Sequence, residues 1–197
     1  NYVQTLIDIG EKNGLCQQAA GLSQSLHKEV TKTASLIAAL QRAGQWQSAR
    51  GPSSIALSTL FAMAALLLDK PLRAESIVLR LPADCPGVVT VAAGDLWLVL
   101  LTLLEQGRCA LNREVSGSQS EKWLSAECQV LAEIPHRLRL VLTNSAAAWE
   151  SDRAGTVWPS LAFCDHLLQV YQASLYLETI TLGKRLLIDL PCRDYAL

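Results

Sequence analysis

Cys164, Asp165 and His166 are three neighbouring residues of the types that serve as nucleophile, acid and base. Nucleophilic catalysis requires the thiol and the imidazole to lie within hydrogen-bond reach of one another. The surrounding residues predict a helix, on which residues one and two positions apart point about 100° and 200° away from each other. The three side chains therefore cannot form a catalytic dyad.

Other patterns of catalytic and ligand sites are absent from the sequence. It contains no Gly-rich phosphate loop, no pair of histidines at metal-ligand spacing and no nucleophile elbow. We therefore predict that the protein is not an enzyme, with no catalytic residue, no metal, no cofactor and no small-molecule substrate.

Basic residues in the C-terminal half form a candidate surface for phosphate or RNA contacts. The candidate contact residues are Arg137, Arg139, Lys184 and Arg185, with His136 and Arg193 nearby. The alternative is a solvated helix face on which they pair with Glu133, Asp189 or Asp194, and we favour this alternative.

Five tryptophans stand out beside only two phenylalanines. Stacking of nucleic-acid bases is one use of exposed tryptophans. Filling gaps between helices or anchoring a protein interface is more common. We expect interface anchors at Trp46, Trp123, Trp149 and Trp158.

The six cysteines are spread almost evenly along the chain, and no two stand two to four residues apart. This spacing excludes a zinc knuckle and a redox pair. Free cysteines among Leu, Ala and Val behave as small hydrophobic residues. We predict reduced thiols in a reducing compartment.

The elements that must position these residues are predicted from a doubled pattern. Leu6-Ile7, Lys12, Gly14 and Ala19 recur thirty residues later as Leu36-Ile37, Arg42, Gly44 and Ala49. A Leu-Ile pair packs a helix, a basic residue suits its carbonyl end, and Gly stops it in the left-handed conformation. Ala then lets a second helix approach, so each copy predicts a helical hairpin.

This pattern resembles pentatricopeptide repeats, with some tetratricopeptide character, over residues 2–50. The run Gly44-Gln45-Trp46-Gln47 is similar to divergent members found in protist mitochondria. The resemblance implies single-stranded RNA binding, one base per repeat. It places base-contacting positions at Thr5 and Ser35, but Val30 stands where the family has Asp or Asn, so a base-reading code is not supported.

Helical patterns continue to Ile188, and no sustained alternation predicts a strand. We therefore expect an all-α fold, an α-solenoid of antiparallel hairpins. It would form a single domain over residues 1–197, with two recognisable hairpins in 1–50 and degenerate ones in 51–197.

Charge and hydropathy exclude some classes of protein. The net charge of −1 argues against a protein that binds nucleic acid by bulk electrostatics. The apolar run from Ile55 to Leu68 is shorter than a membrane span, so a membrane location is not expected.

The predicted function is a non-catalytic scaffold subunit of a large organellar ribonucleoprotein assembly, such as a mitochondrial ribosome, its assembly intermediate or an RNA-processing complex. Its partners would be proteins of that assembly, with RNA as a further contact. Two alternatives stay open, a direct single-stranded RNA-binding repeat protein and a subunit of a mitochondrial membrane complex. We expect a mitochondrial, matrix-side location, with the cytoplasm as the alternative.

Overall fold

The chain forms two compact units, Asn1–Arg42 and Ala43–Leu197. The computed structural model describes residues 3, 5, 16–48, 54–82, 85, 87–114, 121–131, 133–134, 136–146, 149, 160–180 and 183–193. Helix α2 begins in the first unit and ends in the second. All strands and the remaining described helices belong to the second unit.

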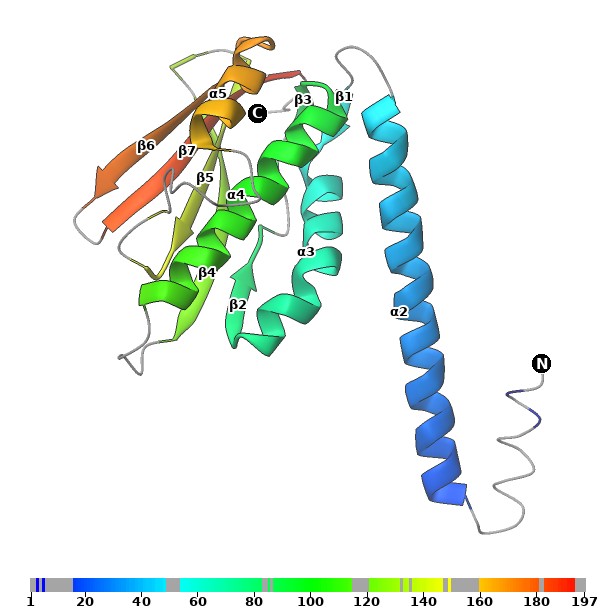
Figure 1. The fold of residues 1–197 in the computed structure, drawn as a ribbon. Coiled ribbons are helices and arrows are strands. Elements are labelled where there is room, and N and C mark those ends of the chain that lie inside the picture. The colour runs from blue at the N-terminus through cyan, green and yellow to red at the C-terminus, as the bar shows by residue number, and fades with distance from the viewer. Residues whose placement is uncertain are drawn as a thin grey trace. The chain divides into compact units, whose positions relative to one another are not determined.

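Helix α2 runs without a break over Cys16–Ser48 (Figure 1). Gly44 and Ala19 both lie inside this helix, so the chain makes no turn at Gly44. A single Gly costs only about 1 kcal/mol in a helix interior, which a long helix tolerates. Gly14 and Ala49 lie outside the described residues. The interpretation of residues 36–49 as a repeat hairpin is therefore wrong.

The second unit contains a seven-stranded sheet in the order β1-β3-β7-β5-β4-β2, with β6 also paired to β7. The strands are β1 (Ser54–Ala56), β2 (Ile77–Arg80), β3 (Val88–Thr90), β4 (Lys122–Val130), β5 (Arg137–Asn144), β6 (Ser174–Ile180) and β7 (Gly183–Arg193). All pairs are antiparallel except β2 with β4, which run parallel.

Three helices form a second layer on one side of this sheet (Figure 1). They are α3 (Leu57–Ala74), α4 (Ala93–Glu114) and α5 (Leu161–Gln169). The fold is thus a two-layer α/β arrangement, and the prediction of an all-α solenoid is wrong. None of the described helices is both long and apolar enough to cross a membrane.

Alternating side chains explain why β5 is a strand rather than the predicted helix. Leu138, Leu140 and Leu142 are fully buried on one face of the strand. On the other face Arg139 and Thr143 are partly exposed, and Val141 is buried. A period of two places these leucines on one face of the sheet, against the helices. Leu186, Ile188 and Leu190 of β7 repeat this pattern, and the two strands pair through these residues.

Helix α3 continues through Pro71 without a break. Pro71 lies in the last turn of the helix, where its carbonyl accepts a hydrogen bond from the Glu75 amide. Ser76 then adopts a positive φ of 56°, and the chain turns into β2.

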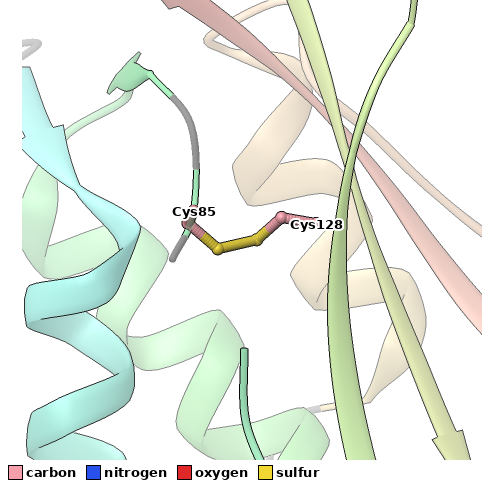
Figure 2. Close-up of a disulfide and its surroundings, with 2 residues drawn as sticks. All are labelled: Cys85 and Cys128. Carbon is pink, nitrogen blue, oxygen red and sulfur yellow. A yellow bond between two sulfur atoms is a disulfide. The ribbon is translucent and has the colours of Figure 1, made fainter. Parts of the chain in front are cut away.

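A disulfide joins Cys85, between β2 and β3, to Cys128 of β4 (Figure 2). Their Cα atoms are 5.7 Å apart, a usual separation for a disulfide. The prediction of reduced thiols is therefore wrong for this pair. Cys109, Cys164 and Cys192 are free.

Candidate functional site

Helix α4 carries the buried polar residues that define the candidate site. Thr102, Glu105 and Gln106 are 0%, 6% and 9% exposed within an otherwise apolar stretch of this helix. Burying a polar side chain costs free energy unless a partner compensates it. Each of the three therefore needs a structural or functional explanation.

Glu105 has a structural explanation, because it pairs with Arg108. Arg108 Nε donates to Glu105 Oε2 at 2.8 Å, and its Nη1 donates to Glu75, the residue that follows α3. Burial lowers the pKa of Arg108, but the hydrogen bonds and charges of Glu105 and Glu75 raise it more, so its pKa lies above the ordinary value. This permanently charged group ties the end of α3 to α4.

Thr102 and Gln106 lie one helical turn apart and share a flank of α4 that is turned away from Arg108. The hydroxyl oxygen of Thr102 has no hydrogen-bond partner among the described residues. No packing role requires a hydroxyl at this fully buried position, since Val would fill the same volume.

Asn144, the last residue of β5, is the third member of the site. It lies directly opposite Leu124 in the β4–β5 ladder and is 7% exposed. Within the part of the chain that the structure describes, neither Nδ2 nor Oδ1 of its amide has a hydrogen-bond partner. A group that offers one donor and one acceptor would satisfy both atoms of this buried amide.

Gly107 brings α4 and the end of β5 together. A Cβ atom at Gly107 would lie 2.8 Å from Leu124 Cδ1 and 3.0 Å from the Trp149 ring. Because Leu124 is the register partner of Asn144, this contact places the Gln106–Gly107 turn of the helix beside the end of β5. We call Thr102, Gln106 and Asn144 the polar row.

A hydrogen bond from a residue after α5 holds the N-terminal end of α4. The Tyr171 hydroxyl, just after α5, donates a hydrogen bond to Asp95 Oδ2 in the first turn of α4. Burial, together with this hydrogen bond and the Asp95 charge, raises the pKa of Tyr171 to about 12. α4 is thus held at one end by α5 and along its length by α3 and the sheet.

The polar row is suited to recognising an uncharged, hydrogen-bonding group such as the edge of a heterocyclic base. An Asn side chain can bind the edge of adenine with two hydrogen bonds, one donated and one accepted. No group of three or more His, Cys, Asp or Glu in the described residues could hold a metal ion.

The predicted basic residues lie on strands rather than on a helix, and most are paired. Arg139 makes two hydrogen bonds to the Asp189 carboxylate, at 2.7 and 2.8 Å. Arg185 pairs with Glu178, and Arg137 donates to the Gln172 carbonyl. Lys184 is exposed, and its carbonyl accepts from Trp149 Nε1 at 3.0 Å.

The tryptophans of the described residues serve packing. Trp46 meets Trp97 edge to face, with ring centroids 6.4 Å apart. Trp123 lies under the Arg80 guanidinium at 5.4 Å, and Trp149 is buried against Gly107. Trp158 lies outside the described residues.

The two predicted base-contacting positions lie on exposed helical residues. Thr5 is exposed, and Ser35 is exposed in α2, where its hydroxyl donates to the Thr31 carbonyl at 3.0 Å. Two residues of the Cys164-Asp165-His166 stretch have structural roles. Cys164 is buried, and Asp165 Oδ1 accepts from the Leu175 amide at 2.9 Å.

No protein-family model and no curated protein matches this chain. Solved structures do match. The catalytic domain of histidine kinase ThkA superposes with a TM-score of 0.57 at 13% identity, covering 73% of this chain and 97% of that domain. The histidine kinase domain of the blue-light activated kinase EL346 from Erythrobacter litoralis gives 0.55 at 19% identity, covering 90% and 89%. Histidine kinase AdeS from Acinetobacter baumannii gives 0.50 at 13%, covering 98% and 96%.

At these identities the likeness establishes the fold alone, and that is enough to correct several predictions. The fold is that of histidine kinase catalytic domains, so the pentatricopeptide and tetratricopeptide resemblance is wrong. The prediction of a scaffold or RNA-binding subunit in an organellar ribonucleoprotein rested on that resemblance and is wrong with it. The prediction of a non-enzyme rested on the absence of catalytic motifs, and the match to catalytic domains of histidine kinases contradicts it.

The expectation of a protein partner is supported only in its general form. ThkA also matches as a structure in complex with the response regulator protein TrrA, with a TM-score of 0.53 at 12% identity, covering 98% of this chain and 57% of that one. RNA and a ribosomal assembly find no support. The mitochondrial location and its cytoplasmic alternative stay predictions.

Proposed function

We propose that this chain is a signalling module of the histidine-kinase type, in which the polar row holds the base of a nucleoside triphosphate. The support is the combination of fold and site. Neighbours of this fold are catalytic domains of histidine kinases, and a kinase must hold a nucleotide that donates its phosphoryl group.

Asn144 carries the proposal. Its amide is more than nine-tenths buried, and both of its polar atoms lack partners among the described residues. An adenine edge offers the complementary donor and acceptor, and its burial would compensate the cost of the desolvated amide. Thr102 offers a further hydroxyl on the neighbouring flank of α4.

The test is titration of the full chain with ATP, ADP and adenosine by calorimetry. We expect Asn144→Leu to weaken binding about 10- to 100-fold, since a paired base contact is worth roughly 1–3 kcal/mol. Thr143→Val is the matched control. It lies next to Asn144 but on the other face of the sheet, where its hydroxyl meets Ser125 Oγ at 2.6 Å. The absence of binding by all three ligands would contradict the proposal.

Comparing ligands with and without phosphates makes this experiment more specific. The sequence contains no Gly-rich loop to surround phosphates. We therefore expect base recognition to supply most of the affinity, so that ATP and adenosine bind within about tenfold of each other, which is about 1.4 kcal/mol.

The missing Gly-rich loop also favours a second candidate function, phosphoryl transfer between proteins. Here the donor is the aspartyl phosphate of a response regulator rather than a nucleotide. His27 is exposed on α2 and has the imidazole that such a transfer needs. Its ring nitrogen would attack phosphorus, and the acyl phosphate bond would break to release the regulator's carboxylate.

Incubation of the full chain with a phosphorylated response regulator separates the two candidates. Transfer between proteins predicts an acid-labile phosphoryl group on the chain that disappears in His27→Gln and persists in His166→Gln, which removes another exposed imidazole. Labelling only from ATP would instead support the nucleotide-dependent candidate.

A further inference from the structure

We propose that the Cys85–Cys128 bond is a thiol–disulfide exchange site, opened and closed by a dithiol oxidoreductase, and that its state controls how the chain between β2 and β3 is held to the sheet. The proposal is independent of nucleotide binding. It rests on where the bond lies, on which cysteines can react and on what remains paired without the bond.

The bond lies where, among the described residues, β4 has no strand partner on one side. β2 pairs with β4 only from Lys122 to Ser125, while the opposite edge of β4 pairs with β5 as far as Val130. Cys128 is in this second half of β4. Figure 2 shows the disulfide reaching from Cys128 on the strand to Cys85 on the passing chain. The bond therefore replaces strand pairing at this place.

Both cysteines of the pair are half-buried, so a partner's thiolate can reach them. Two of the free cysteines are less suited to exchange. Cys164 and Cys192 are buried, burial raises the pKa of Cys164 to about 11, and burial also raises the pKa of Cys192. Thiols that stay protonated near neutral pH are poor nucleophiles. Neither buried thiol therefore competes with the partner's thiolate for the Cys85–Cys128 bond.

The rest of the sheet does not depend on the bond. β2 stays paired with β4, and β3 stays paired with β1 and β7. Opening the disulfide therefore frees the connection at Cys85 without removing a strand. Cys128 faces the same side of the sheet as its register partner Leu140, which is fully buried, so the freed position borders the core.

The exchange step conserves atoms and electrons. A thiolate of the partner attacks Sγ of one cysteine, the Sγ–Sγ bond breaks, and a mixed disulfide forms with release of the other cysteine as a thiol. The second thiol of the partner then displaces the first cysteine. Two electrons and two protons pass to the pair, and the partner becomes a disulfide.

The experiment uses the full chain and reduced thioredoxin as the dithiol probe, with alkylation and mass spectrometry to locate free thiols. We expect labels to appear together at Cys85 and Cys128, at least tenfold faster than with a monothiol at equal thiol concentration. Far-UV circular dichroism should not change. Hydrogen exchange should increase in peptides that contain Cys85 or residues 126–130, and little elsewhere.

Two variants complete the test. Cys85→Ser should show the increased exchange without any reductant, and Cys109→Ser, which removes a half-buried free thiol, should behave as the wild type. A bond that is reduced only in denaturant would overturn the proposal. So would loss of the folded spectrum on reduction, since both outcomes describe a structural disulfide.

Discussion

Gly107 is the residue that allows α4 to lie against the sheet at the polar row. A Cβ atom there would press on Leu124 and Trp149, both of which are buried. We predict that Gly107→Ala destabilises the fold by up to about 2 kcal/mol, because overpacking costs about 1–3 kcal/mol and better helix propensity returns only about 1 kcal/mol.

Urea unfolding checks this prediction, and Gly44→Ala is its control. Gly44 is also helical, but an added Cβ would meet nothing within 4 Å. We therefore expect Gly44→Ala to be neutral or stabilising by up to about 1 kcal/mol. Equal effects of the two substitutions would contradict the close approach at Gly107.

Tyr171 makes stability depend on alkaline pH. Its pKa of about 12 in the folded state lies above its ordinary value near 10. The folded state therefore holds the proton more tightly, and this stabilisation is complete below pH ~10 and is lost as the pH rises to about 12. Tyr171→Phe should remove this part of the pH dependence.

Unfolding midpoints in urea from pH 8 to 11.5 give the measurement. The buried thiol of Cys164, with a pKa of about 11, contributes in the same direction. Only the difference between wild type and Tyr171→Phe therefore reports the tyrosine. Parallel pH profiles for the two proteins would show that the Tyr171–Asp95 contact does not form in solution.

At the scale of elements, Arg108 joins α3 to α4 by binding both Glu75 and Glu105. Removing the cation leaves the buried Glu105 carboxylate without its partner. We predict that Arg108→Ala costs about 2–3 kcal/mol, below the usual range for a fully buried pair because the group is partly exposed.

The comparison for this prediction is Arg80→Ala. Arg80 pairs with Glu121 on the surface, where both side chains are more than half exposed, and such pairs contribute at most about 1 kcal/mol. Arg108→Met, which keeps the aliphatic volume, should lie between the two. A loss for Arg108→Ala no larger than that for Arg80→Ala would mean that α3 and α4 are held by apolar packing alone.

The elements also show which parts of this fold the sequence could predict. α3 and α4 follow from helical periodicity. β5 alternates Leu with Arg at 137–140, but Leu is a strong helix former and masked the period of two. The doubled Leu-Ile, Gly and Ala pattern misled for a related reason, because Gly44 lies inside a helix long enough to tolerate it.

The candidate site was harder to predict than the fold. Thr102 and Gln106 have the spacing of one helical turn within an apolar run, which is a readable signal of a polar flank. Asn144 gives no such signal, since its significance depends on the register that sets it opposite Leu124 and on the approach of α4 at Gly107. Long-range pairing of this kind cannot be seen in local sequence patterns.

At the scale of the whole molecule, the polar row, the disulfide and the sheet all belong to the unit Ala43–Leu197. This unit has its own apolar core between the sheet and the helices α3, α4 and α5. We therefore predict that a fragment of residues 43–197 folds alone and unfolds in one cooperative transition.

The fragment of residues 43–197 should bind adenosine within about twofold of the full chain, because every residue of the polar row is retained. The exposed imidazole of His27 lies in the other unit, so the same fragment should accept no phosphoryl group from a response regulator if transfer between proteins is the function. A folded fragment that has lost adenosine binding would show that residues 1–42 complete the site.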